Sequence, residues 1–270
     1  MRTLPDFFQL ENYNVSAVDV TRMVFHSEPD AIHPDVILFP YWQADLFSPW
    51  VDRITTIRTD VLYEVEYRGS KFSLVRSGIG APLAGDMTLA LGLTPCERLL
   101  FAGSVGGLQP AIRIGDLMIP EFSYSGDGYC RYLEPEAPKK DCMLEQVRPD
   151  PSLSSTLLHL AMERAQEVEV KVHQGPVFSI DTILSQFRLL DYFSGELDCV
   201  GIEMETAAVF KAARRVGIQC AALLSVSDVP VNKQTLLSGR SLQEQDHRKE
   251  IRSKVLTRIL LDCILSSASD

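Results

Sequence analysis

The sequence predicts a single α/β domain, a three-layer sandwich in which helices flank a mixed, largely parallel central sheet. Three observations support this fold class. Apolar runs of strand length alternate with helix-like segments along the chain. Several of these runs are apolar throughout, which is typical of strands covered on both faces. No linker divides the 270 residues, so we expect one domain over 35–270 preceded by an N-terminal extension over 1–34.

The first half of the chain supplies the strands that begin this sheet. The short apolar run 35–39 ends at a proline and predicts a buried strand, with an outgoing loop over 41–45. The runs 61–67 and 71–75 flank an Arg-Gly-Ser turn, as in a β-hairpin. The run 98–102 is apolar again and predicts a further strand.

Glycine-rich stretches follow two of these strands. One contains Gly80 and opens a helix that runs to about Leu91, and the other begins with Gly103 and Ser104. Glycines after strands let backbone N–H groups approach an anion or a sugar closely. Neither stretch ends in the Lys-Ser/Thr pair of a nucleotide-triphosphate loop, and helix packing explains such turns equally well. Both interpretations stay open.

The second half continues the alternation. A turn and strand at 114–120 precede a loop-like insertion over 121–149, which is long enough to be a lid or a specificity element. A helix over 150–167 begins at an Asp-Pro pair, and a strand returns over 171–179. A last helix over 242–265 carries an i, i+4 apolar stripe and should pack on the sheet.

One stretch holds the carboxylates of greatest interest. Glu203 and Glu205 precede an Ala-rich helix over 206–216, and a strand over 218–226 then leads to Asp228. Ligands of open α/β sheets bind at the carboxyl ends of the strands, so Asp228 is a candidate site residue. An ordinary polar turn after a strand is the alternative.

Composition restricts the partners. The net charge of −10 opposes a nucleic-acid partner, because such binding depends on Lys and Arg that neutralise phosphates. Six cysteines without a C-x-x-C pair favour a reducing cytoplasm without a structural metal. We expect no cofactor. No apolar run is long enough to span a bilayer. We therefore expect a cytoplasmic protein that acts on a small molecule.

Six short motifs stand out when they are taken together. They are Gly78-Ile-Gly80, Gly103-Ser-Val-Gly-Gly-Leu108, Ile114-Gly-Asp116, Phe178-Ser-Ile-Asp181, Glu203-Met-Glu205 and Ser227-Asp228. In order and spacing they resemble the nucleoside phosphorylase family of the purine nucleoside and uridine phosphorylase type, which also includes the methylthioadenosine/adenosylhomocysteine nucleosidases. The resemblance covers about residues 35–265. It implies a catalytic domain with a nine- or ten-stranded sheet that cleaves the N-glycosidic bond of a nucleoside.

The resemblance also implies roles for the nucleoside-binding residues. Glu205 would accept hydrogen bonds from ribose hydroxyls, and Met204 would pack under the sugar. Phe178 and Ile202 match positions that wall the base pocket. For Glu203 we prefer a supporting or interface role over direct contact with the substrate, because residues two apart need not face one pocket.

Asp228 matches the residue that protonates N7 of the departing base in the purine-specific branch. General acid catalysis of this kind contributes ~10² to 10⁴ in rate. The match favours a purine nucleoside as the substrate. Arg240 lies one position short of an arginine that hydrogen-bonds this aspartate in the family, and a solvated surface arginine is the alternative.

The chain departs from the family at the phosphate site. The phosphorylases hold phosphate with an arginine in the first loop, one before the Gly-Ser motif and one from a neighbouring subunit. Asp45 and Phe101 stand where the first two would fall. Arg58 matches the third, which implies a homo-oligomer, at least a dimer or a trimer of dimers, and Ser104 keeps its hydroxyl.

Three functions therefore compete. In the first, inorganic phosphate is a co-substrate that binds through Arg58, Ser104, the amides around Gly80 and Gly103, and Arg76. In the second, water is the nucleophile and Asp45 is its base, as in the nucleosidases. In the third, the chain is a non-catalytic nucleoside-binding protein, against which the retained Glu205 and Asp228 argue.

Overall fold

The structure, a computed structural model, describes residues 8–137, 139–168 and 170–266. Its helices are α1 (Ala17–Phe25), α2 (Ala81–Leu91), α3 (Pro151–Gln166), α4 (Thr206–Val216), α5 (Leu242–Ile251) and α6 (Thr257–Leu265). Its strands are β1 (Asp35–Phe39), β2 (Arg53–Arg58), β3 (Leu62–Tyr67), β4 (Ser70–Arg76), β5 (Arg98–Gly107), β6 (Leu117–Gly126), β7 (Gln146–Val147), β8 (Val172–Ile180), β9 (Gly201–Glu203) and β10 (Gln219–Asp228).

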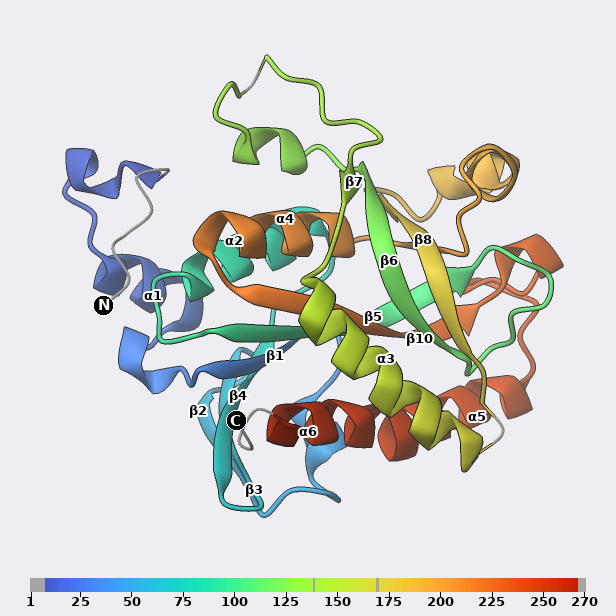
Figure 1. Cartoon of the computed structure of the whole chain (residues 1–270), viewed down its shortest axis with the longest axis horizontal. Helices are drawn as coiled ribbons and strands as arrows, with labels where there is room; N and C mark the ends of the chain where they lie inside the picture. Colours follow the sequence, from blue (N-terminus) through green and yellow to red (C-terminus); the bar gives the residue numbers. More distant parts are fainter. Residues whose placement is uncertain (1–7, 138, 169, 267–270) are drawn as a thin grey trace.

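The helices cover the two faces of the sheet in separate groups. Helices α1, α2 and α4 pack together on one face, and α3, α5 and α6 lie on the other (Figure 1). Each group closes its own large cluster of buried apolar side chains. The predicted three-layer α/β sandwich is confirmed. Within the described ranges, no helix is long and apolar enough to cross a membrane.

The central sheet has the strand order β10-β6-β8-β9-β5-β1-β4-β3-β2, with β7 beside β6. Strand β10 also pairs with β5, so β5, β9, β8, β6 and β10 close into a ring. Among the described residues, five pairings are parallel and five are antiparallel. The mixed sheet is confirmed, and the hairpin of β3 and β4 is the one predicted.

The second glycine-rich stretch differs from its prediction. Gly103 to Gly107 continue strand β5 and do not form a loop after it. The pairing with β9 joins Gly106 to Ile202, and a Cβ atom on Gly106 would lie 3.1 Å from the Ile202 side chain. The glycines therefore serve close packing of neighbouring strands.

The C-terminal half of the core follows the sequence closely. Helix α4 ends at Gly217, whose φ of 70° is the left-handed conformation that glycine adopts without strain. Asp150 accepts a hydrogen bond from the Leu153 amide and caps α3. The last helix runs from α5 to α6 through one π-helical turn, Arg252–Leu256. These elements carry Asp228 and the arginines discussed below to one edge of the sheet.

The N-terminal extension and the insertion both pack on the helical layer. Phe25 and Ile32 are completely or almost completely buried, and α1 contacts α2. Residues 1–7 of the extension lie outside the described residues, and the boundary at 34 stays a prediction. In the insertion, β6 extends to Gly126 and β7 pairs with it, so part of the predicted loop is sheet.

Candidate active site

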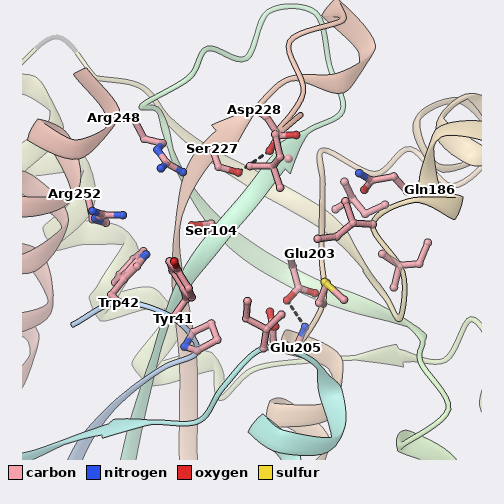
Figure 2. A pocket seen from close by; sticks show the side chains of 18 of the residues that line it. Tyr41, Trp42, Ser104, Gln186, Glu203, Glu205, Ser227, Asp228, Arg248 and Arg252 are labelled. Carbon is pink, nitrogen blue, oxygen red and sulfur yellow. Dashed lines mark hydrogen bonds between the residues drawn. The ribbon is translucent and has the colours of Figure 1, made fainter. Parts of the chain in front are cut away.

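A cavity of about 290 Å³ opens at the edge of the sheet where the polar motifs meet. Its walls come from the loop after β1, from β5, from the segment after β8, from β9 and the start of α4, from the end of β10, and from α5 (Figure 2). The size suits a small ligand of the nucleoside class. None of the described residues of the insertion lines it, so the structure does not place the insertion as a lid.

Glu205 and Met204 line one wall of the cavity. Glu205 is 4% exposed, and its Oε1 accepts a hydrogen bond from the Gly80 amide at 2.7 Å. Gly80 has a φ of 104°, a backbone conformation that favours glycine. Burial, followed by the nearby charge of Glu203, raises the pKa of Glu205 to about 8. The site therefore holds a carboxyl group that a hydrogen-bonding ligand can ionise.

Glu203 is engaged by its own chain. Its oxygens accept hydrogen bonds from the Ser179 hydroxyl, from the Thr206 hydroxyl at 2.7 Å, and from the amides of Glu205 and Thr206 at 2.7 Å each. Burial raises the pKa of Glu203, and the hydroxyl donors of Ser179 and Thr206 oppose that shift. The carboxylate thus holds the start of α4 and the backbone of Glu205, although Glu203 also lines the cavity. The supporting role that we prefer for it stays a prediction.

Asp228 lies at the end of β10 and is 3% exposed. The pairing of β10 with β5 shifts between Val226 and Asp228, and such a bulge turns a side chain to a new direction. Asp228 accepts a hydrogen bond from the Ser227 hydroxyl at 2.6 Å. Burial raises the pKa of Asp228, while the Ser227 bond and the charge of Arg240 oppose the shift. A buried carboxyl group whose pKa is raised is suited to act as a general acid toward a ligand.

Arg240 reaches the cavity beside Asp228. Its guanidinium donates to the backbone carbonyls of Ser227 at 3.2 Å and Leu236 at 2.8 Å. The two carbonyls fix the arginine near the aspartate, and its charge acts on the carboxylate through space. The structure thus brings Arg240 to Asp228 without the direct hydrogen bond that the resemblance implies.

The predicted base pocket is only partly as expected. Ile202 lines the cavity, but Phe178 does not. Phe178 packs behind the wall, with its ring 4.2 Å from that of Phe193. Ile180, two residues further along β8, takes the lining position, together with the polar side chain of Gln186. Nothing in the sequence marked Gln186.

The glycine-rich stretches supply part of the predicted anion site. Ser104 lines the cavity from the middle of β5. Gly103 does not line it, and lies against the side chains of Phe101 and Leu224. The Gly80 amide is already bonded to Glu205, so it is not free to bind an anion.

Three further candidates lie away from the cavity within this chain. Arg58 is exposed on β2, at the far edge of the sheet. Arg76 is paired with Asp60 at 3.1 Å. The short 3₁₀ helix Ala44–Phe47 buries its first and last residues and leaves Asp45 exposed between them. None of the three is a lining residue.

Two arginines that the motifs did not mark line the cavity. Arg248 comes from the last turn of α5, and Arg252 begins the π-helical turn that follows (Figure 2). Their spacing of four residues places them on one face of the helix. They lie beside the apolar stripe Ile251, Val255 and Ile259 on the same helical segment, and this proximity is the signal that could have indicated half-buried arginines.

Comparison with known proteins agrees with this geometry. The model of the phosphorylase superfamily matches residues 46–264. The chain belongs to the phosphorylase superfamily. It is 25% identical over 198 residues to the DeoD-type purine nucleoside phosphorylase of Mycoplasma genitalium. The aligned region covers 73% of this chain and 80% of that relative.

Other superfamily members are similar over comparable lengths. A 5′-methylthioadenosine/S-adenosylhomocysteine nucleosidase of Buchnera aphidicola is 23% identical over 214 residues, 76% of this chain and 88% of that protein. The crystal structure of purine nucleoside phosphorylase from Toxoplasma gondii, in complex with immucillin-H, superposes with a TM-score of 0.71 at 18% identity, and covers 90% of this chain and 96% of that one. The predicted family, and the prediction that the chain is one of its enzymes, are confirmed.

Proposed function

We propose that this superfamily member cleaves the N-glycosidic bond of a purine nucleoside with phosphate as the nucleophile. One observation carries the proposal: Glu205 and Asp228, both buried, line the same cavity from different walls (Figure 2). A sugar anchor and a proton donor on separate walls are what cleavage between a sugar and a base requires. The similarity to purine nucleoside phosphorylases supports the choice of substrate class.

The residues divide the reaction between them. Glu205 would accept hydrogen bonds from the ribose hydroxyls over Met204, which fixes the sugar while positive charge develops at C1′. The C1′–N bond breaks and its electron pair leaves with the base, which takes the proton of Asp228 at N7. An oxygen of phosphate forms the new bond to C1′ and gives ribose 1-phosphate. Gln186 and Ile202 would contact the base.

Hydrolysis is the second candidate, because Phe101 and Asp45 stand at two of the family's phosphate-binding arginine positions. Water would then attack C1′ in place of phosphate. The exposed position of Asp45 weakens its role as the base that activates this water. A non-catalytic nucleoside-binding protein is a third candidate. The two buried carboxylates, Glu205 and Asp228, argue against it.

The reaction with and without phosphate tests these candidates. Inosine, adenosine and methylthioadenosine are incubated with the protein, and release of free base is followed by chromatography. Strict dependence on phosphate, with ribose 1-phosphate as product, is expected. Equal rates without phosphate would establish hydrolysis, and no release from any purine nucleoside would contradict the proposal.

We also propose a homo-oligomer, a dimer or a trimer of dimers, in which Arg58 reaches a neighbouring cavity. The exposed position of Arg58 on an outer strand supports it. Light scattering gives the mass of the assembly. A monomer at working concentrations that is fully active would contradict this part of the proposal.

A further inference from the structure

The cavity contains more positive charge than its sugar and base contacts require. Arg248 and Arg252 both line it, and the Nε atom of each is buried without a hydrogen-bond partner in the described ranges of the chain. Among the described residues, no carboxylate lies within ion-pair distance of either guanidinium. Buried donors of charged groups normally have partners, because leaving them unpaired destabilises the fold. The pair thus offers unpaired, positively charged donors to a ligand of the cavity.

We propose that Arg248 and Arg252 bind a phosphate group in the cavity, in place of the two family arginines that this chain lacks. The inference rests on the proposed function, since the phosphate is a participant in that reaction. Guanidinium groups bind phosphate oxygens through paired, charge-assisted hydrogen bonds. The helix that begins at Leu242 would then do what the first loop and the position before the Gly-Ser motif do in the phosphorylases.

The surroundings hold the two arginines in position. The guanidinium of Arg252 stacks over the buried Trp42 ring at 5.4 Å, which ties the helix to the loop after β1. Figure 2 shows both arginines on the side of Trp42 and Ser104. The Ser104 hydroxyl lines the same cavity and is a further donor for a phosphate oxygen. The helix spacing, the aromatic ring and the hydroxyl together make a built site.

The electrostatics support an anion at this place. Burial lowers the pKa of Arg248, and the positive charges of Arg252 and Arg240 add to the shift. Burial likewise lowers the pKa of Arg252. Asp228 is the carboxylate that offsets part of the charge on Arg248, but its own pKa is raised by burial. A bound phosphate would relieve the mutual repulsion of the guanidinium groups.

The phosphate group has two chemical sources. Inorganic phosphate would place its oxygens for attack at C1′, whereas a nucleoside 5′-monophosphate would bring its phosphate with the substrate. Both need the same donors. Calorimetric titration with inorganic phosphate, and separately with inosine 5′-monophosphate, distinguishes the two sources.

Three variants test the site: Arg248→Gln, Arg252→Gln and the control Arg258→Gln. Arg258 stacks on Trp50 at 5.1 Å, in α6, and does not line the cavity. We expect each cavity variant to weaken phosphate or nucleotide binding about 10- to 100-fold, the range for loss of charge-assisted hydrogen bonds. The control should bind as the wild type does.

Unfolding is checked separately, by circular dichroism, and Arg252→Lys provides a variant that keeps the charge. If the wild type binds neither probe, or if both Gln variants bind them unchanged, the inference is wrong. Phosphate-independent cleavage of inosine, with no phosphate binding, overturns the inference but leaves nucleoside cleavage intact. Phosphate binding that depends on Arg248 and Arg252, without cleavage of any nucleoside, supports the inference and contradicts the proposed function.

Discussion

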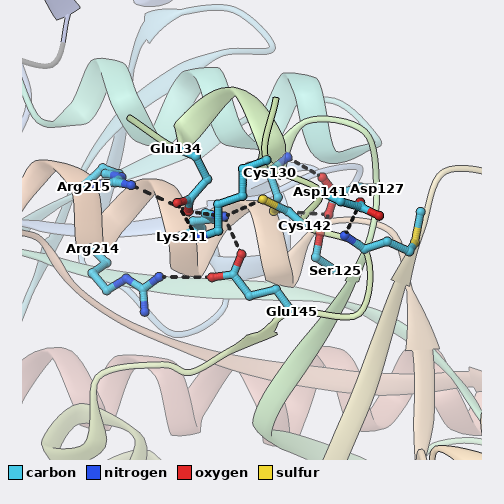
Figure 3. Close-up of polar contacts among 12 residues, drawn as sticks. Ser125, Asp127, Cys130, Glu134, Asp141, Cys142, Glu145, Lys211, Arg214 and Arg215 are labelled. Carbon is cyan, nitrogen blue, oxygen red and sulfur yellow. Dashed lines mark hydrogen bonds and ion pairs between the residues drawn. The ribbon is translucent and has the colours of Figure 1, made fainter. Parts of the chain in front are cut away.

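Two groups of charged residues, one around Lys211 and one in the cavity, differ in how far their charges are paired within the described part of the chain. Lys211 of α4 is fully buried, and its amine lies 2.7 Å from Glu134 and 2.6 Å from Glu145 (Figure 3). It also contacts the sulfur of Cys142 at 3.5 Å. The three acceptors lie within 4.8 Å of one another, as the ligands of a metal ion would, and the lysine amine is bonded to all three.

The candidate active-site cavity differs in the state of its charges. Hydrogen bonds from Lys140 and then Lys211 hold the pKa of Glu134 at about 2, whereas burial and a like charge raise the pKa of Glu205 to about 8. Arg214 and Arg215 pair with the Lys211 group, whereas the Nε atoms of Arg248 and Arg252 have no hydrogen-bond partner among the described residues. The paired group fastens the insertion to α4, and the unpaired group is arranged for a ligand.

The largest expected effect concerns the proton donor of the cavity. Asp228→Asn keeps the shape of the side chain but removes the acid, so kcat/KM for inosine should fall ~10² to 10⁴-fold. Steady-state kinetics measures it. Asp262→Asn is the matched control, because Asp262 pairs with Arg164 outside the cavity. Unchanged turnover in Asp228→Asn would remove the aspartate from the mechanism.

The next effect concerns the paired group. Lys211→Met leaves two carboxylates without their central cation, so the free energy of unfolding should fall by about 3 kcal/mol. The loss is limited because Lys140 still pairs with Glu134 and Arg214 with Glu145. Urea denaturation measures it. The exposed pair of Lys254 and Glu250 provides the control, since Lys254→Met should leave stability unchanged. Full stability of Lys211→Met would mean that the group is not structural.

A smaller effect, the pH dependence of stability, is expected from Glu205 in the cavity. Glu205 keeps its proton in the folded state up to about pH 8, whereas the unfolded chain loses it near 4.5. Stability should therefore fall as the pH rises from about 4.5 to 8, by a few kcal/mol at most. Glu205→Gln still accepts from the Gly80 amide and removes this fall. The urea midpoints of the wild type and Glu205→Gln are measured at pH 5 and at pH 8.5, and the difference between the two proteins should change with pH. A difference that stays constant contradicts the raised pKa of Glu205.

The smallest effect is expected for a neighbour of the lysine. Cys142→Ser replaces a weak acceptor by a hydroxyl of similar shape, so stability should change by less than ~1 kcal/mol and nucleoside cleavage should not change. Thermal unfolding and the base-release assay measure both. A large loss of activity would show that the two charged groups are coupled, which their separation in the fold does not predict.

Much of the fold could be predicted from local patterns. The strand over 35–39, the hairpin, and the helix that ends at Gly217 lie where the sequence indicated, because apolar periodicity and glycine caps act over a few residues. Strand β2 was missed, since its exposed residues show no apolar pattern. The glycines of β5 were taken for a loop, because glycine alone does not distinguish a turn from tightly packed strands.

The sequence by itself determined the family, and it predicted the roles of Glu205 and Asp228 and the absence of two phosphate-binding arginines, because these depend on residue identity and spacing. Only the tertiary structure decided which polar side chains share the cavity. Arg248 and Arg252 have the same helical spacing as many surface arginines, and their environment depends on Trp42 and Ser104, more than a hundred residues away. A side chain becomes part of a site through burial beside distant segments, and the local sequence carries no record of that burial.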